Sequence, residues 1–251
     1  MSEPPFTGVA VALVTLFDDD GELDAAASAQ HARRLVDRGV RAVVVAGTTG
    51  EALTLDPEER VRLLDAVRGA VSVPVLAGTG AVSIRQATEL TRAAVDHGAD
   101  GLLVLSPPGA RDVRPYYEAV AGVAGDVPVL AYHFPAVSAP GIPVEALADL
   151  PVAGLKDSSG DAERLLHEVA EWGGPLYPGA ATLLLLAGAV GCPGAILALA
   201  NLEPEMCVAA LAGDADAQVE LMASHRATAG VPALKEHLAA RYGTSRVCRV
   251  L

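Results

Sequence analysis

The chain is poor in aromatic residues, cysteine and lysine, and each scarcity excludes some kinds of core, cross-link or site. Aromatics make up 4% of the 251 residues and hydrophobic residues 51%, so a sizeable core must be built from alanine, valine and leucine. The three cysteines, Cys192, Cys207 and Cys248, are widely spaced without a C-x-x-C pair. That pattern argues against a disulfide framework or a zinc site and favours a reducing cytoplasm.

Positive charge is also scarce. The chain has 18 basic and 31 acidic residues, a net charge of −13, which argues against nucleic acid or an anionic membrane as partner. Residues 1–6 have no basic region or apolar core of a signal peptide. The most apolar stretch, Ala180–Leu202, is broken by glycines and a proline and is typical of a buried helix, turn and strand. We expect a cytoplasmic protein with small-molecule partners.

Short apolar runs alternate with glycine-rich loops and amphipathic helices along the chain. The runs are apolar on both faces, as in parallel strands covered on both sides. Eight strands are predicted: Val9–Val14, Ala42–Ala46, Val73–Ala77, Gly101–Leu105, Val127–Tyr132, Val152–Leu155, Leu176–Tyr177 and Gly194–Leu197. Their alternation with helices is compatible with a (β/α)8 barrel or a doubly wound sheet, and the strand count and length favour the α/β TIM barrel.

Helix ends carry recognisable signals. We expect N-caps at Asp24, Asp56 and Ser83, and helix ends at Gly69 and Gly98. After Asn201 the pattern is helical only, over Glu203–Ala212, Ala215–Ala229 and Pro232–Tyr242. The predicted domains are a catalytic barrel at 1–212 and a short C-terminal helical extension at 213–251.

Only two lysines occur in the chain, Lys156 and Lys235, against sixteen arginines. Lys156 ends the apolar run Pro151–Leu155 and precedes the polar turn Asp157-Ser158-Ser159-Gly160. Burial of a lysine amine disfavours the ammonium form and makes the amine nucleophilic. The alternative is a surface lysine with a solvated head. We expect a buried, nucleophilic Lys156, because the residue lies in a strand-like segment.

Active sites of barrels lie at the carboxyl ends of the strands. There the predicted strands bring Gly47-Thr48-Thr49-Gly50-Glu51, Tyr132-His133-Phe134-Pro135 and Lys156-Asp157-Ser158. A lysine amine, a phenol and a glycine-flanked threonine pair suit capture of a carbonyl, proton transfer and anchoring of a carboxylate. A 2-oxo acid needs those three functions.

The motifs resemble those of the dihydrodipicolinate synthase / N-acetylneuraminate lyase family of class I, Schiff-base-forming aldolases. The resemblance rests on motifs in order over about 200 residues: Val14-Thr15 with Asp18–Gly21, Gly47–Glu51, Ala77–Gly80, Tyr132-x-x-Pro135 and Gly154–Asp157. It implies a barrel with a C-terminal helical extension, no cofactor or metal, and a homo-oligomer, either a tetramer or a dimer.

The resemblance also assigns roles by position. Lys156 would form the imine with a 2-oxo acid, Tyr132 would shuttle protons, and Thr48 would link Tyr132 into a hydroxyl relay. Thr49, with the Gly47 loop, would hold the substrate carboxylate, and the carbonyl of Ile196 would orient the lysine. Asp157 and Ser158 would bind the aldehyde partner.

The chain departs from the family pattern at three places. Gly109 stands where the family usually has a relay tyrosine, and Val137 stands where dihydrodipicolinate synthases have a carboxylate-binding arginine. After Tyr242 only nine residues follow, so the last family helix is expected to be missing. The missing arginine argues against a true dihydrodipicolinate synthase. The hydrogen-bonding side chains of Asp157–Ser159 suit a polyhydroxylated aldehyde, so we expect an aldolase for pyruvate or a 2-keto-3-deoxy sugar acid.

Two other functions are compatible with the sequence. A catalytically impaired member could bind a small 2-oxo acid as regulator or scaffold. A phosphate-binding barrel isomerase is the other, although no basic residue adjoins Gly179, Gly191 or Gly194. Glu51 is expected to be structural. The five helical histidines, which include His31, are expected on solvated faces and share no metal-ligand spacing.

Overall fold

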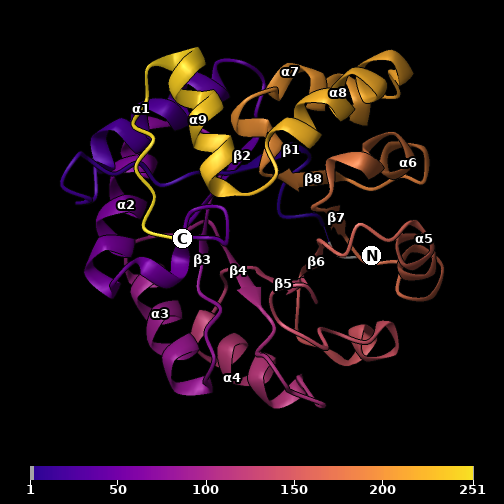
Figure 1. Ribbon diagram of the computed structural model, residues 1–251. Coiled ribbons are helices and arrows are strands. Elements are labelled where there is room, and N and C mark those ends of the chain that lie inside the picture. Colours follow the sequence, from indigo (N-terminus) through magenta and orange to yellow (C-terminus); the bar gives the residue numbers. More distant parts are fainter. Residues whose placement is uncertain (1–2, 251) are drawn as a thin grey trace.

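The computed structural model describes residues 3–250. Met1, Ser2 and Leu251 lie outside this range. The predicted segment 1–6 and the predicted extension 213–251 therefore fall partly outside the described residues. In the described part, the eight predicted strands and the helices between them are present (Figure 1).

The strands are all parallel and follow the order β7-β6-β5-β4-β3-β2-β1-β8, with β7 and β8 side by side at the seam. They are β1 (Gly8–Ala12), β2 (Ala42–Val45), β3 (Val75–Gly78), β4 (Gly101–Leu105), β5 (Val129–His133), β6 (Gly154–Asp157), β7 (Leu176–Pro178) and β8 (Gly194–Leu197). This nearly closed barrel confirms the predicted TIM fold.

Helices surround the strands. They are α1 (Ala25–Val36), α2 (Pro57–Ala70), α3 (Ile84–Asp96), α4 (Arg114–Ala124), α5 (Ala162–Glu171), α6 (Leu184–Ala189), α7 (Pro204–Leu211), α8 (Ala215–Ala227) and α9 (Val231–Tyr242). Short 3₁₀ turns are η1 (Ala52–Thr54), η2 (Val144–Asp149), η3 (Ala181–Leu183) and η4 (Leu199–Asn201). No helix within residues 3–250 is both long and apolar enough to span a membrane.

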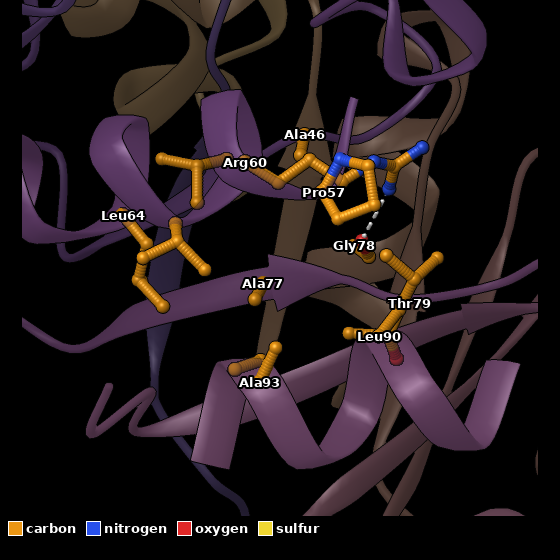
Figure 2. A pocket seen from close by; sticks show the side chains of 12 residues that line it. Ala46, Pro57, Arg60, Leu64, Ala77, Gly78, Thr79, Leu90 and Ala93 are labelled. Atoms are coloured by element: carbon orange, nitrogen blue, oxygen red, sulfur yellow. Dashed lines mark hydrogen bonds between the residues drawn. The ribbon is translucent and has the colours of Figure 1, made fainter. Parts of the chain in front are cut away.

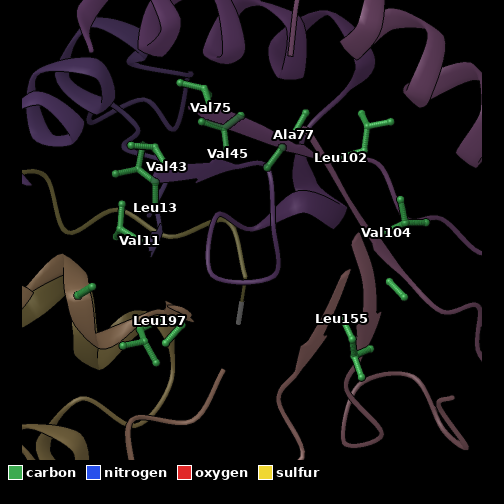
Figure 3. Packing of buried hydrophobic residues seen from close by; sticks show 14 of the residues in the cluster. Val11, Leu13, Val43, Val45, Val75, Ala77, Leu102, Val104, Leu155 and Leu197 are labelled. Atoms are coloured by element: carbon green, nitrogen blue, oxygen red, sulfur yellow. The ribbon is translucent and has the colours of Figure 1, made fainter. Parts of the chain in front are cut away.

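Alternation along each strand divides the core into two layers. Outward-facing residues such as Val43, Val75 and Leu155 pack beneath the helices (Figure 3). Inward-facing residues such as Ala10 and Leu130 fill the barrel together with Tyr132 and Tyr177. Because small and large side chains alternate inside, few aromatics suffice to fill the interior.

Several strand and helix limits differ from the prediction for identifiable reasons. Strands β3 and β5 begin after Pro74 and Pro128, because proline cannot donate to the strand ladder. The predicted helix end at Gly69 is wrong, since α2 runs on to Ala70. The N-caps at Asp24, Asp56 and Ser83 are confirmed.

The expectation that His31 is solvated is also wrong. Its side chain is fully buried between α1 and the C-terminal helices, 5.7 Å from the Tyr242 ring. Burial, together with the Arg34 charge, lowers the pKa of the His31 imidazole to about 4. The sequence pattern of α1 does not show that the C-terminal helices cover the face of α1 that carries His31.

A buried asparagine links the first strand of the barrel to the segment that follows the last strand. Asn201 in η4 accepts the Val14 N–H at 3.1 Å and donates to the carbonyls of Ala12 at 2.7 Å and Ala198 at 2.8 Å. Its amide therefore pairs backbone groups at the carboxyl ends of both β1 and β8. The sequence pattern did not reveal this role.

We predict that Asn201→Ala lowers the free energy of unfolding by about 2–4 kcal/mol, because it leaves buried backbone groups unpaired. Urea denaturation measures the difference. Gln30→Ala, which removes an exposed amide from α1, is the matched control and should change stability by less than about 0.5 kcal/mol. Equal effects of the two substitutions would contradict the role given to Asn201.

Candidate active site

The lysine and tyrosine predicted to react with substrate are cross-strand neighbours. Tyr132 in β5 is paired in register with Lys156 in β6. Both side chains point into the barrel, and the Lys156 Nζ lies 4.2 Å from the centroid of the Tyr132 ring. The structure thus brings the amine and the phenol together near the carboxyl ends of the strands.

The barrel shelters this lysine from water. The residue is 5% exposed and Tyr132 is 4% exposed. Gly179, just after β7, makes the room: a Cβ there would lie 3.1 Å from the Lys156 Cε and 1.9 Å from the Ser158 Oγ. Any larger residue at position 179 would therefore displace the amine or the serine.

The threonine loop after β2 is held in a constrained conformation. Ala46 and Glu51, which flank it, have positive φ angles of 51° and 55°. A Cβ at Gly78 would lie 2.1 Å from the Ala46 carbonyl oxygen, so only glycine permits this approach of β3. Constrained backbone of this kind persists only where surrounding contacts enforce it, and it is common at active sites.

Two pockets flank the lysine at the barrel mouth. The first, which we call the Tyr132 pocket, has a volume of about 140 Å³ and includes Gly47, Thr48 and Tyr132 in its wall. The second, the α8 pocket, has a volume of about 550 Å³ and includes Phe134, Gly179 and Arg226. Lys156 adjoins a wall residue of each, Tyr132 and Gly179.

A third pocket lies outside the barrel, between α2, α3 and strands β2 and β3 (Figure 2). Its volume of about 20 Å³ has room for roughly one water molecule. There Arg60 donates to the Gly78 carbonyl at 3.0 Å, which fixes the end of β3 next to Ala46. The residues that line this pocket hold the loops after β2 and β3 in place, and the pocket is too small for a substrate.

The other predicted site residues fall into two groups. Ile196 lies in the barrel interior in the same apolar cluster as Tyr132, and Thr49 is half-buried in the loop beside Thr48. Ser158 lies against Gly179, next to Lys156. Asp157 is not brought together with them, because strand alternation turns it outward.

Asp157 faces helix α5 instead of the barrel interior. Its carboxylate accepts the Ser159 N–H at 2.7 Å and the Ser159 hydroxyl at 2.9 Å, and lies 3.6 Å from the Arg164 Nε. A carboxylate that is 3% exposed and engaged in this way has no path to a substrate at Lys156. The expectation that Asp157 binds the aldehyde therefore has no support in this geometry.

Asp157 belongs to a group of buried ionisable side chains behind the lysine strand. Glu168 on α5 is fully buried, with its Oε1 2.8 Å from the Arg164 Nε. Burial, and then the Asp157 carboxylate, raises the pKa of the Glu168 carboxyl to about 8. Burial and the Arg164 charge lower the pKa of His133 to about 4.

These shifts predict a pH-dependent stability. The folded protein keeps the Glu168 proton up to about pH 8, whereas the unfolded chain loses it near the ordinary value of 4.5. The Glu168 contribution is therefore present at low pH and lost as pH rises from 4.5 to 8, by at most about 1.4 kcal/mol per pH unit.

Glu168→Gln, which stays neutral, should remove that loss. Unfolding free energies of wild type and variant, measured between pH 6.5 and 8, should converge or cross as pH rises. Parallel curves would show that the Glu168 carboxyl is already ionised at pH 6.5. Glu171→Gln on the exposed side of α5 is the control, and its curve should parallel wild type.

The second lysine forms a buried ion pair that sequence analysis missed. Lys235 on α9 lies 2.5 Å from the Glu51 Oε1, and both side chains are fully buried. The ammonium also donates to the Val247 carbonyl at 2.7 Å and lies 4.5 Å from the Phe17 ring centroid. The scarcity of lysine was the one signal that could have drawn attention to it.

Glu51 also fastens residues 244–250, here called the C-terminal segment, to the threonine loop. Its Oε2 accepts the N–H groups of Arg249 at 2.7 Å and Val250 at 2.9 Å. Arg249 in turn pairs with Glu59 at 2.7 Å. Figure 1 shows this segment leaving α9 and running to the centre of the molecule near β3. Glu51 is structural, as expected, and it holds the C-terminal segment against the threonine loop of the candidate site.

Removing one partner of the Lys235–Glu51 ion pair should destabilise the folded protein. We predict that Lys235→Met lowers the free energy of unfolding by about 3–5 kcal/mol, because the Glu51 carboxylate stays buried without its cation. Lys235→Met with Glu51→Gln should recover part of that loss. Urea denaturation of both single variants and the double variant gives the coupling, and strictly additive losses would contradict a direct pair.

The fold and site together define a class: a parallel eight-stranded barrel with a sheltered lysine beside a tyrosine near the carboxyl ends of the strands. Residues 5–239 match the Dihydrodipicolinate synthetase family. The chain belongs to this family of class I aldolases and lyases, which confirms the resemblance seen in its motifs.

Individual relatives agree with this assignment. The chain is 37% identical to a 4-hydroxy-tetrahydrodipicolinate synthase of Natronomonas pharaonis over 85% of this chain and 78% of the relative. It is 40% identical to an uncharacterized DapA-like lyase of Halobacterium salinarum over 80% and 69%. A solved structure from E. coli K12, a prophage protein of the dihydrodipicolinic acid synthase family in complex with pyruvate, is similar with a TM-score of 0.88, 25% identity and coverage of 96% and 91%.

Proposed function

We propose that the protein is a cofactor-free lyase in which Lys156 forms a Schiff base with a 2-oxo acid. The observation that carries this proposal is the sheltered amine 4.2 Å from the Tyr132 ring centroid. The donor substrate is pyruvate, or the pyruvate portion of a longer 2-oxo acid in the cleavage direction. Pyruvate in the related E. coli K12 structure supports this choice.

The reaction begins when the neutral Lys156 amine attacks the ketone carbon and forms a carbinolamine. Loss of water gives a protonated imine, which accepts electrons as a proton leaves the adjacent carbon. The resulting enamine carbon bonds to the carbonyl carbon of an aldehyde, whose oxygen takes up a proton. Water then hydrolyses the imine and restores the amine, and the reverse sequence cleaves the same bond.

The remaining residues take roles that suit their positions. Tyr132 delivers and accepts the protons, and Thr48 in the same pocket extends the relay. Thr49 and the N–H groups of the Gly47 loop hold the substrate carboxylate, and the Ile196 carbonyl orients the amine. Ser158, beside Lys156 and Gly179, faces the bound acid.

We also propose that the chain forms a homo-oligomer. Leu53 and Val82, exposed by 86% and 67%, line the same surface pocket, and Ile84 at the start of α3 is 45% exposed. Apolar side chains gathered in this way are typical of surfaces that a partner covers. Light scattering after size exclusion measures the assembly state.

The Schiff base is tested by borohydride reduction in the presence of pyruvate. We predict that intact mass rises by one reduced pyruvyl group, that peptide mapping places it on Lys156, and that Lys156→Ala shows no adduct and no turnover. Lys235 is fully buried and ion-paired, so it should stay unmodified.

Tyr132→Phe separates catalysis from binding. The variant should still form the adduct but lose turnover by about 10²–10⁴-fold, the usual size of an acid–base contribution. Wild-type protein that forms the adduct but turns over no aldehyde would instead be a binding protein for the acid. Wild-type protein without any adduct would overturn the proposal.

A further inference from the structure

The Tyr132 pocket is apolar next to the proposed reacting atoms. Its wall includes Leu53, Leu103, Leu105, Val137 and Val250, together with Tyr132 and Thr48. It opens beside the phenol that would protonate the aldehyde oxygen, so the remainder of an aldehyde whose oxygen faces Tyr132 extends into this space. The chemistry of the wall therefore selects the aldehyde.

No charge in this wall is available to a substrate. Among the described residues that line the pocket, Glu51 is the one charged side chain. Both of its oxygens are occupied, Oε1 by Lys235 and Oε2 by the N–H groups of Arg249 and Val250.

The polar groups of the wall, the Thr48 and Tyr132 hydroxyls and the backbone at Gly47, are the ones assigned above to the proton relay and to the carboxylate of the 2-oxo acid. An anionic or polyhydroxylated substituent on the aldehyde would therefore lose its hydration against the leucine and valine side chains without gaining partners there, which is costly.

One side of the wall is built by the C-terminal segment. Val250 reaches the pocket because its N–H is bonded to Glu51 at 2.9 Å and because Arg249 is fixed to Glu59. Arg249 also donates to the carbonyls of Gly21 at 2.7 Å and Thr54 at 3.1 Å. The position of Val250 is thus set by several contacts from separate parts of the barrel.

The pocket volume limits the size of the group. The volume of about 140 Å³ is close to that of apolar protein cavities of about 150 Å³ that bind benzene. Because Gly47 and Thr48 in the same wall adjoin the carboxylate of the acid, this volume is an upper limit, and a branched four- to six-carbon chain or a single phenyl ring is the largest substituent of this size. Asp157 and its neighbours had suggested a polyhydroxylated aldehyde, but Asp157 faces away from the barrel interior.

From these observations we propose that the second substrate is an aldehyde with a compact, uncharged apolar substituent, and that Val137 and Val250 determine this specificity. The enamine carbon of the pyruvate adduct bonds to the aldehyde carbon, and the carbonyl oxygen becomes a hydroxyl by taking a proton. The substituent stays in the Tyr132 pocket throughout. This inference rests on the proposed Schiff-base function and narrows its substrate class.

The test compares kcat/KM for benzaldehyde, isovaleraldehyde, glyceraldehyde and aspartate semialdehyde with saturating pyruvate and the purified full chain. We expect the two apolar aldehydes to be preferred by at least about 10-fold. Val137→Ser and Val250→Ser should each lower kcat/KM for the apolar pair by about 5–10-fold and leave glyceraldehyde unchanged or improved.

Two control variants locate the effect. Val219→Ser makes the same substitution at a valine that is 71% exposed on α8, and Arg226→Ala alters the α8 pocket. Both should retain the wild-type preference. Val137 is 46% exposed and Val250 keeps its N–H bond after substitution, so both variants should fold, which thermal unfolding checks.

The outcomes separate this inference from the proposed function. A pyruvate adduct on Lys156 combined with a preference for glyceraldehyde or aspartate semialdehyde overturns the inference and leaves the Schiff base intact. An adduct with an unchanged aldehyde preference in Val137→Ser and Val250→Ser also overturns it, as does a change in assembly state that accounts for their loss of activity. Absence of any adduct in wild type rejects the proposed function itself.

Discussion

The burial of one lysine side chain inside a parallel barrel is the constraint on which the site depends. Lys156 can lie within reach of Tyr132 because β5 and β6 are in register and because Gly179 leaves space beside its Cε. The rest of the interior is filled with aliphatic side chains and with the stacked rings of Phe6 and Tyr177, which exclude water from the barrel.

A second buried lysine serves the same site from a distance. Lys235 neutralises Glu51, and Glu51 holds both the constrained loop that carries Thr48 and the C-terminal segment that carries Val250. The positive φ of Glu51 is maintained by these contacts. The Tyr132 pocket is therefore assembled from segments separated by almost the whole chain length.

Sequence reasoning predicted the barrel and the proximity of Lys156 to Tyr132, because both depend on local pattern. Apolar runs followed by glycine-rich loops marked all eight strands, and the residues at strand ends included Lys156 and Tyr132. It failed where contacts are distant in sequence. The pairing of Glu51 with Lys235 and the burial of His31 depend on how the C-terminal helices pack. The hydrogen bonds of Asn201 depend on how β8 pairs with β1. Asp157 was misplaced because a residue next to an inward-facing lysine in a strand must face outward.

The central claim is that the Lys156 amine bonds covalently to the ketone carbon of a 2-oxo acid, and a crystal structure after soaking with pyruvate tests it most directly. The account predicts continuous electron density from the Lys156 Nζ to the pyruvate C2, with the carboxylate at the Thr48–Thr49 loop and the Tyr132 hydroxyl beside the new bond. Pyruvate bound elsewhere, or an unmodified Lys156 turned away from Tyr132 at saturating pyruvate, would contradict the account.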